Sequence, residues 1–496
     1  MTETQAGVQA IDHVALLPAY LAAGTVLLAL LVDLAAGRRR LTVAATGLGA
    51  VAVAVAAWWV GADQHRETFC VGDACSYVAD SAGAVVAVVF AVLTLGVLGL
   101  SAPVLRSLPA GEYCFLLAAS MTGGVVLGYA RDLITLIVAL ETLTLPLYAL
   151  VALRRRSVAS ASGAMTFFVV SVVSVAVTLL GAALLYAATG TVHLTALAAA
   201  GEPAGPLRPL ALVGSVLVVA GLVFKLAAVP FHAWAPAAYD GAPVPVAAYL
   251  STASKLGGVV AVVYVVAIGL PPWLPVAGPA LAGFAVLSMT VGNLVALRQR
   301  RMVRLLAWSS VAQAGYILAP LGAFALAAGR TEDAQALAVS ATVAYAIFYV
   351  MIEFAAFGSV VALRGPADGG TIEDYRGVAR RSPLIGAAFT LALVGLAGLP
   401  PGLAGLFAKV VIVRSLLGGG AEWLAVVVAV NAVIGLAYYL RVAAQLYAPG
   451  PVGTTPAPAE PHRRSPVVMV ALAAATVLAV VAGFAPQLVL DAAAGF

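Results

Sequence analysis

The sequence predicts an all-α polytopic membrane protein with about 14 transmembrane helices. Of its 496 residues, 63% are hydrophobic and 9% are charged, whereas soluble globular proteins carry about 25% charged residues. Apolar runs recur along the whole chain, at roughly the 20 residues that an α-helix needs to cross a bilayer. These observations exclude a soluble globular domain, a disordered chain and a disulfide-rich secreted fold.

Motifs for redox and nucleotide chemistry are missing. The chain has three cysteines, too few for a disulfide scaffold or a cysteine-ligated iron–sulfur cluster. It has no Walker loop, no dinucleotide-binding glycine pattern and no histidine pair with metal-ligand spacing. Its arginines are spread over short loops and form no basic tract, which argues against nucleic acid. We therefore expect no cofactor or metal in this chain.

Fourteen spans follow from marking the apolar runs and the Gly, Pro and charged clusters between them. The first span has no Lys or Arg before it, and we expect a membrane span there, not a cleaved signal peptide. The spans lie near 14–36, 42–62, 81–105, 111–130, 132–152, 164–188, 209–229, 246–269, 274–297, 303–326, 336–363, 383–417, 421–446 and 466–488.

Two of these segments are expected to be broken. The twelfth is too long for one straight crossing and contains the run Leu-Pro-Pro-Gly at 399–402. Because proline removes a backbone donor, the freed backbone groups must face protein or water there, not lipid. The seventh segment ends in a similar manner at Pro230, before a polar, proline-rich re-entry up to Pro245.

The arginines predict the orientation of the chain, because cytoplasmic loops carry an excess of positive charge. One set of alternate loops holds 18 arginines and the other holds 5, which places both termini outside the cytoplasm. The poorer set is Arg66, Arg131, Arg208, Arg330 and Arg414. The richer set is Arg38, Arg39, Arg40, Arg106, Arg154, Arg155, Arg156, Arg298, Arg300, Arg301, Arg304, Arg364, Arg376, Arg380, Arg381, Arg441, Arg463 and Arg464.

Five charged residues lie inside predicted spans. Lys225, Lys255 and Lys409 are the only lysines in the chain, whereas every cation in a loop is an arginine. An arginine keeps its proton in a protein, but a desolvated lysine can lose it. Glu141 and Glu353 join them, and five unpaired intramembrane charges would cost about 15 kcal/mol. A proton or ion path is therefore the leading hypothesis.

Structural alternatives exist for these residues. Lys225 is close enough to a helix end for its amine to reach the membrane interface, and Glu141 could form a purely structural pair with a lysine. Glu353 is either functional, a static partner for a neighbouring subunit, or a buried neutral acid. His232, just after Pro230, is either a member of a proton relay or a polar group at a helix end.

The cysteines leave one question open. Cys70 and Cys75 lie in a loop expected outside the cytoplasm, where a local disulfide and free thiols are about equally supported. Cys114 lies in a span, and we expect a small core residue there.

Four stretches carry a family resemblance. The run FKLAAVPFHAWAPAAYDGAPVPVAAYLSTASKLGG at 224–258 resembles the segment 7–8 region of subunit N of the proton-translocating NADH:quinone oxidoreductase, respiratory complex I. Its YDGAPVP portion is more similar to subunit N than to the related subunits L and M. The stretches 131–150, 292–318 and 373–409 agree, so that the resemblance to this antiporter-like family covers most of 111–446.

The resemblance implies site residues and a repeat. Glu141, Lys225, Lys255 and Lys409 match the family's residues on segments 5, 7, 8 and 12, which form a hydrated line of titratable groups in the membrane; Glu353 and His232 are further candidates. The implied organisation is N-terminal helices 1–3 (1–110), a first repeat of helices 4–8 (111–269), a second, inverted five-helix repeat of helices 9–13 (274–446), and a loop with helix 14 (447–496).

The resemblance also implies an activity and partners. The chain is expected to move protons in the inner (plasma) membrane of a bacterium, while partner subunits bind NADH, FMN, iron–sulfur clusters and quinone. Membrane subunits of the K, M, L and J type are the expected partners, with the lipid bilayer. Alternatives are an Mrp-type cation/proton antiporter, an energy-converting hydrogenase or ferredoxin-linked enzyme, and a non-pumping structural subunit.

The sequence departs from the family pattern at segments 6 and 11. Ser162 and Thr166 stand at the places of an acid and a lysine in the run SGAMTFF, so Glu141 is expected to lack its usual nearby cation. Glu353 stands where an asparagine is common.

Overall fold

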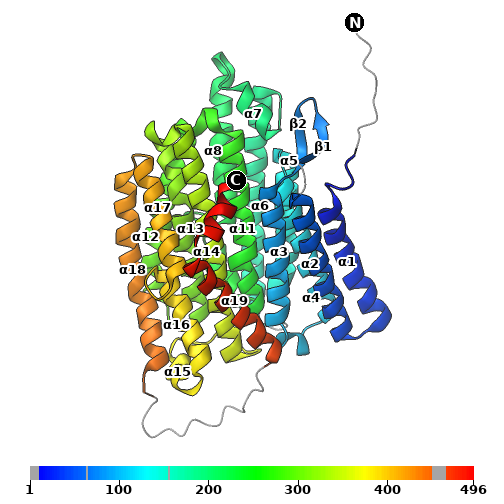
Figure 1. Ribbon diagram of the computed structural model, residues 1–496, viewed down its shortest axis with the longest axis vertical. Coiled ribbons are helices and arrows are strands. Elements are labelled where there is room, and N and C mark those ends of the chain that lie inside the picture. The colour runs from blue at the N-terminus through cyan, green and yellow to red at the C-terminus, as the bar shows by residue number, and fades with distance from the viewer. Residues whose placement is uncertain (1–10, 63–64, 155–156, 450–464) are drawn as a thin grey trace.

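The computed structural model describes residues 11–62, 65–154, 157–449 and 465–496. Long helices run side by side along the long axis of the molecule, and one hairpin of two strands projects from one end (Figure 1). We call this end the hairpin end and the opposite end, where α1 turns into α2, the arginine-rich end. The all-α polytopic fold class is confirmed, since the hairpin is the only sheet in the part of the chain that the structure describes.

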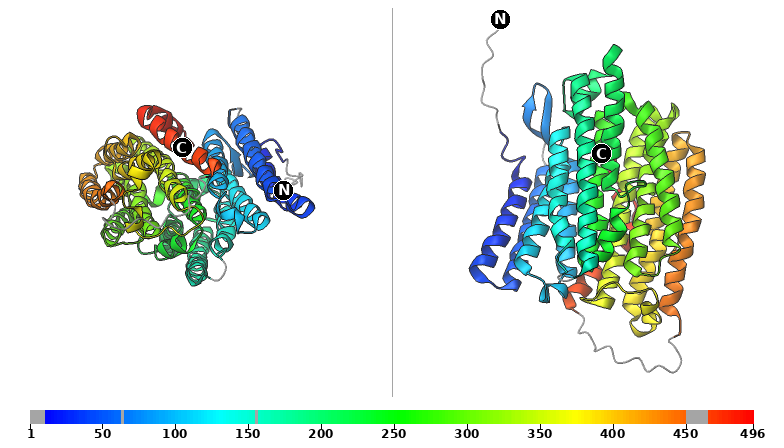
Figure 2. Two further views of the ribbon diagram at one scale, coloured as in Figure 1. Left: turned by 90° about the horizontal axis from the view of Figure 1, so that it is seen from below. Right: turned by 180° about the vertical axis from the view of Figure 1, so that it is seen from behind.

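The N-terminal helices lie at one side of the bundle (Figure 2). Only 17% of the most apolar part of the first helix is buried, so it is peripheral. The antiparallel strands of the hairpin connect the second helix to the third, which begins where the Asp80 carboxylate accepts a hydrogen bond from Gly83 N at 2.7 Å. The elements are α1 (Leu17–Ala36), α2 (Arg39–Ala62), β1 (Arg66–Val71), β2 (Ala74–Ala79) and α3 (Ser81–Leu100).

The next group of helices contains the first break. Asp132 caps the fifth helix by accepting hydrogen bonds from Ile134 N and Thr135 N, both at 2.9 Å. The eighth helix ends at Lys225 and the chain resumes a helix at Trp234. The group comprises α4 (Ala110–Tyr129), α5 (Leu133–Val151), α6 (Val158–Thr189), α7 (Leu194–Ala200), α8 (Arg208–Lys225) and α9 (Trp234–Gly241), with 3₁₀ turns η1 (Val104–Arg106) and η2 (Gly205–Leu207).

The most buried segment follows the first break. It is one continuous run whose hydrogen bonding changes from α to π and back, and 89% of its most apolar part is buried. Short π-helical turns inside helices occur frequently at functional sites, and here one ends directly before Lys255. The run comprises α10 (Val244–Tyr249), η3 (Leu250–Ser254), α11 (Lys255–Tyr264) and η4 (Val265–Gly269).

The remaining helices surround a long central one, α14, which packs against α3, α10, α11, α13, α16, α17, α19 and α20. The second break lies between α16 and α17. The helices are α12 (Leu274–Ala296), α13 (Met302–Gly322), α14 (Glu332–Arg364), α15 (Val378–Arg381), α16 (Pro383–Ala397), α17 (Leu403–Gly418), α18 (Glu422–Tyr447), α19 (Pro466–Phe484) and α20 (Gln487–Ala494), with 3₁₀ turns η5 (Pro271–Trp273), η6 (Ala323–Ala325), η7 (Ala328–Arg330) and η8 (Glu373–Tyr375).

The predicted spans agree with these helices. Within the described residues, 12 helices are long and apolar enough to cross a membrane, and they account for twelve of the fourteen predicted spans. The other two are α13, whose Ser309, Ser310 and Gln313 make it more polar, and the pair α16 and α17, each too short to cross alone. Both departures have a functional meaning, because these elements contribute to the site described below.

Several predicted boundaries are wrong by four to six residues, among them the end of the third span, which is Leu100 instead of 105. The sixth helix begins at Val158, six residues earlier than predicted, because the Ser157 hydroxyl accepts a hydrogen bond from Ser160 N at 3.2 Å and caps it. The seventh span ends at Lys225 instead of Val229, and Ala227 has a positive φ of 57°, which a helix cannot accommodate.

Candidate functional site

The first buried charge pair joins α5 to the end of α8. Lys225 Nζ donates to Glu141 Oε1 at 2.7 Å, to Ser171 Oγ on α6 at 3.0 Å and to Thr144 Oγ1 at 3.2 Å. The lysine side chain is 5% exposed and the glutamate side chain 22% exposed. All three donor hydrogens of the ammonium therefore have an oxygen partner, and its charge is balanced by a carboxylate.

Glu141 lacks the usual cation from segment 6, as expected, but another helix supplies one. Ser162 is exposed and Thr166 is half-buried, so the α6 positions of the family pattern contribute no charge. Lys225 reaches Glu141 instead because α8 stops at that residue, and Ser171, five residues beyond Thr166, completes the contacts. The pair thus forms without the lysine that the resemblance implied on segment 6.

The second lysine lies in the buried central run. Lys255 is 2% exposed, and its Nζ donates to the carbonyl oxygen of Ser310 and to Ser310 Oγ on α13. Ser310 Oγ also shares a hydrogen bond with Tyr349 OH at 2.9 Å, and Tyr349 OH donates to Ser251 O at 3.0 Å. Serine and tyrosine hydroxyls both donate and accept, so this cluster can exchange protons with the lysine.

The first two lysines lie on elements in direct contact. Gly258 follows Lys255 by three residues on α11, and a Cβ atom added to it would come within 3.1 Å of Lys225 Cβ. The absence of a side chain at this glycine therefore allows α11 to approach the end of α8. The two lysines occupy neighbouring positions across this contact.

Glu353 is buried on α14, within electrostatic range of Lys255. It is 0% exposed, and neither carboxyl oxygen has a hydrogen-bond partner among the described residues. Lys255 is the cation that acts on it, and the phenols of Tyr239, Tyr349 and Tyr439 are within electrostatic range. A buried carboxyl group without a partner is costly, so this position is not that of an ordinary core residue.

The third lysine lies at the second break. Lys409 Nζ donates to Leu396 O at 2.9 Å and lies 5.1 Å from the centre of the Tyr316 ring. Its side chain passes over Gly398, where an added Cβ would come within 2.5 Å of Lys409 Cδ. Among the ion pairs of the described residues, none includes this lysine. Its charge is therefore stabilised by a backbone dipole and a ring face.

A hydrogen-bonded chain connects the third lysine to α13. Leu396 O, the acceptor for Lys409, also accepts from Gln313 Nε2 at 3.3 Å. The same Gln313 nitrogen donates to Tyr439 OH at 3.2 Å, and Tyr439 OH shares a 2.5 Å hydrogen bond with Ser309 Oγ. Ser309 is adjacent in sequence to the serine that binds Lys255. Residues of α13 thus touch both lysine environments.

The central helix lines the same region with one face. Tyr345, Tyr349 and Glu353 are spaced by four residues on α14 and therefore lie on one side of it. Tyr345 OH donates to Gln313 Oε1 at 2.5 Å, on the side of Lys409. Tyr349 OH contacts Ser310, on the side of Lys255. The stripe thus borders both halves of the polar region.

His232 lies apart from these contacts. It is half-buried in the first break, and its ring packs 5.1 Å from the ring of Trp308. Its Nδ1 has no hydrogen-bond partner in the described ranges. The structure records no contact between this ring and the three lysines, so its part in a relay stays a prediction.

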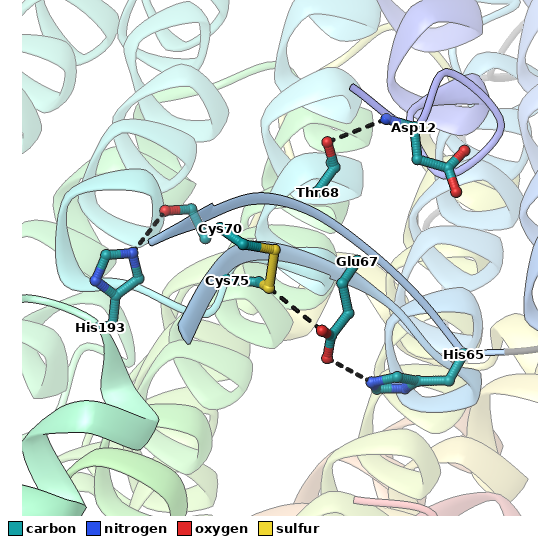
Figure 3. Close-up of a disulfide and its surroundings, with 8 residues drawn as sticks. Asp12, His65, Glu67, Thr68, Cys70, Cys75 and His193 are labelled. Carbon is teal, nitrogen blue, oxygen red and sulfur yellow. Dashed lines mark hydrogen bonds and ion pairs between the residues drawn. A yellow bond between two sulfur atoms is a disulfide. The ribbon is translucent and has the colours of Figure 1, made fainter. Parts of the chain in front are cut away.

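The two hairpin cysteines are joined. Cys70 and Cys75 form a disulfide across β1 and β2, next to Glu67 (Figure 3). The hairpin is attached to the rest of the chain by the Asp12 N–H, which donates to Thr68 Oγ1 at 3.2 Å, and by His193, which shares a 3.2 Å hydrogen bond with Ser76. Because both sulfurs are bonded to each other, Glu67 and the cysteines do not form a metal site.

The comparisons with known proteins cover nearly the whole chain. The family model described as NADH:quinone oxidoreductase/Mrp antiporter, TM, matches residues 130–435. NADH-quinone oxidoreductase subunit N of Salinispora tropica is 63% identical, over 98% of this chain and 99% of the relative. This chain belongs to the subunit N family.

Solved structures give a wider view of the subunit N family. A chain of respiratory complex I from Thermus thermophilus superimposes with a TM-score of 0.76 and 29% identity, covering 96% of this chain and 98% of that one. A chain of the Mrp complex from Dietzia has a TM-score of 0.82 at 22% identity, covering 98% and 97%. The second likeness shows a shared fold alone, and the family model spans both kinds of protein, whereas the 63% identical relative is a subunit N.

The YDGAPVP stretch, by which the subunit N resemblance was recognised, contributes an ion pair. Asp240 accepts from Arg301 Nε at 2.9 and 3.0 Å, and Arg301 Nη2 donates to Asp368 at 3.0 Å. Partial burial opposes ionisation of Asp368, but the hydrogen bond and charge of Arg301 outweigh it and keep the pKa of Asp368 below its usual value. The stretch therefore connects α9 to two loops of the second half.

The sequence pattern did not identify the uncharged residues of this site. Ser171, Ser310, Gln313, Tyr345 and Tyr439 contact the lysines or their partners, but none has a charge to attract attention. Their signal is visible in retrospect, because a serine pair and a glutamine lie within the 292–318 stretch of an otherwise apolar chain. Polar residues on one face of a spanning helix deserve the same scrutiny as charges.

Proposed function

We propose that this chain is the proton-translocating membrane subunit N of an NADH:quinone oxidoreductase, respiratory complex I. Its family membership along almost the whole chain supports this function. The observation that carries the proposal is the Glu141–Lys225 ion pair at the first break, together with the buried Lys255 and the half-buried Lys409. NADH, FMN, the iron–sulfur clusters and quinone belong to partner subunits.

In this mechanism, changes in pairing move protons. While Glu141 is ionised, its charge stabilises the protonated Lys225; when Glu141 accepts a proton, that stabilisation is lost and the lysine releases its own. Lys255 receives a proton across the contact between α8 and α11, and Ser310 and Tyr349 hold the ammonium in place. In this proposal, electrostatic coupling to the partner subunits drives these steps, and the redox chemistry is assigned to those subunits.

Glu353 carries protons between the second and third lysines in this proposal. Its carboxyl group is within electrostatic range of Lys255 and of the Tyr439 phenol, and that phenol accepts a hydrogen bond from the Gln313 amide that also donates to the carbonyl binding Lys409. A carboxyl group can both accept and donate a proton at this point. The two breaks, at 226–233 and 398–402, are corresponding elements of the two inverted repeats at 111–269 and 274–446 in the same proposal.

The proposed orientation places the hairpin end outside the cytoplasm. A disulfide persists in an oxidising compartment, and Cys70–Cys75 lies at that end. The arginine-rich end then faces the cytoplasm, as the loop charges predict; Arg155, Arg156, Arg463, Arg464 and His462 lie outside the described residues. The proposed setting is a bacterial inner membrane with K, M, L and J type subunits as partners.

A substitution of Lys225 by arginine tests the proton-carrying role. Lys225→Arg keeps the positive charge beside Glu141 but introduces a group that does not release its proton. We expect proton translocation coupled to NADH oxidation in membrane vesicles to fall at least tenfold. Glu141→Gln should lower the same rate by a similar factor.

The matched control is Arg208→Lys, at the exposed first residue of the same helix, which should pump normally. Full pumping by Lys225→Arg in an assembled complex would show that the ion pair is merely structural. Should that variant not assemble, normal pumping by Glu141→Gln would overturn the proposal equally.

A further inference from the structure

A cavity of about 830 Å³ opens at the arginine-rich end, away from the buried lysines. It lies between the turn that joins α1 to α2 and the chain that joins α3 to α4. Four arginines line it: Arg38, Arg39 and Arg40 from the first segment and Arg106 from the second. Two segments more than 60 residues apart thus direct positive charge to one place.

Local acids offset these arginines only in part. Asp33 and Glu112 also line the cavity, so four positive and two negative side chains face it, and the Asp33 carboxylate accepts a hydrogen bond from Thr42 Oγ1 at 3.1 Å. Arg39 Nη1 donates to the carbonyl of Leu105 at 3.1 Å, which fixes one side of the cavity. In the described part of the chain, no ion pair involves any of the four guanidinium groups.

A second arginine position at the same end shows the contrast. Arg301 lies between Asp240 and Asp368, so its charge is used within the protein. The tendency of cytoplasmic loops to carry positive charge accounts for arginines in a loop. It does not account for four guanidinium groups from two segments around a single cavity. An anion bound from outside the chain would pair with these guanidinium groups.

The surroundings of the cavity are apolar and face outward. Leu34, one turn before the arginines, is 74% exposed, and Leu41, which lines the cavity directly after them, is 48% exposed. Both belong to α1 and α2, the helices at the outer side of the bundle. The positive charge matches the anionic headgroup of a phospholipid, and the exposed leucines at the end of the membrane helices match its acyl chains.

We propose that this cavity binds the phosphate headgroup of an anionic membrane phospholipid, with its acyl chains along Leu34 and Leu41. Guanidinium groups bind phosphate oxygens through paired hydrogen bonds, and basic pockets between membrane helices on the cytoplasmic side bind anionic headgroups. The lipid would hold the α1–α2 turn against the α3–α4 connection. This site is independent of the proton path.

The test measures lipid that is retained by the purified, intact assembly. After exchange into neutral detergent, phosphatidylglycerol is titrated in and bound lipid is quantified by mass spectrometry, with phosphatidylcholine as the neutral probe. The test variant is Arg38→Gln/Arg40→Gln/Arg106→Gln, which leaves Arg39 on its backbone carbonyl. We expect the wild type to bind phosphatidylglycerol at least tenfold more tightly than this variant.

The matched control removes three exposed arginines from another turn at the same end, Arg298→Gln/Arg300→Gln/Arg304→Gln, and should bind like the wild type. Equal binding by all three proteins, or equal loss in both variants, would overturn the proposal. Displacement of the lipid by millimolar inorganic phosphate would assign the cavity to free phosphate instead. Loss of a partner subunit from the test variant, with lipid unchanged, would assign it to an acidic protein segment.

Discussion

Lys225 and Lys409 lie beside the two helix breaks but are stabilised differently. Lys225 ends the helix before the first break and has a carboxylate and two hydroxyls as partners. Lys409 lies in the helix after the second break and reaches back to a single carbonyl. The comparison teaches that the first lysine is held in an ion pair, whereas the described contacts of the second are a backbone carbonyl and the face of the Tyr316 ring.

The largest expected difference concerns stability. Lys225→Met leaves Glu141 as an uncompensated charge, and breaking a buried pair by removing one partner costs about 3–5 kcal/mol. Lys409→Met leaves no acid behind and should cost much less. The melting temperatures of the purified assemblies should therefore fall sharply for Lys225→Met and slightly for Lys409→Met. Equal melting temperatures would remove the distinction between the two lysines.

The next effect concerns the glycines against which the lysines pack. Gly398 has a φ of 82°, and its missing Cβ leaves room for the Lys409 side chain. Gly398→Ala combines a collision with backbone strain of about 1–3 kcal/mol and should displace Lys409 and reduce pumping. Gly258→Ala, which has no positive φ and a looser contact with Lys225, is the matched variant and should be milder. The reverse order in a vesicle assay would contradict this account.

A smaller effect is expected at the carboxyl group between the two lysine regions. Glu353→Gln keeps the shape of the side chain but cannot carry a proton, so coupled proton translocation should fall about fivefold, equivalent to roughly 1 kcal/mol of activation free energy. Glu353→Asp, which retains the carboxyl group, should recover part of the rate. Unaltered pumping in Glu353→Gln vesicles would show that this acid is static.

The smallest effect is expected at the surface of the arginine-rich end. Asp368→Asn removes a partly exposed partner of Arg301, and such pairs contribute about 0–1 kcal/mol. Because the pKa of Asp368 lies below its usual value, its contribution is complete above about pH 4 and declines as the pH falls through the lowered pKa. Melting curves of variant and wild type should differ slightly at neutral pH and converge in acid.

The fold could be predicted from the sequence because its physical cause is local. Apolar runs of membrane length and the two proline breaks are visible residue by residue, and the charges inside the spans identified the three lysines. What the sequence could not show is which groups meet. The bond from Lys225 to Glu141 joins residues 84 apart, and it depends on where α8 stops.

The helix ends and the neutral residues were harder to predict for a different reason. Capping by Ser157 and the positive φ of Ala227 moved two boundaries, and such local backbone effects leave little trace in hydropathy. Ser310 and Gln313 were missed because their importance comes from tertiary contacts with Lys255 and Leu396. A pattern of charges locates the site, but three-dimensional packing selects its neutral members.

The single long helix α14 has a mechanical consequence. One continuous helix presents Tyr345 toward the Gln313 side and Tyr349 toward the Lys255 side, and the four residues between them span about 6 Å. A twist or slide of this helix large enough to release one phenol from its acceptor must shift the other as well. A displacement that breaks the hydrogen bond of Tyr345 therefore also changes that of Tyr349.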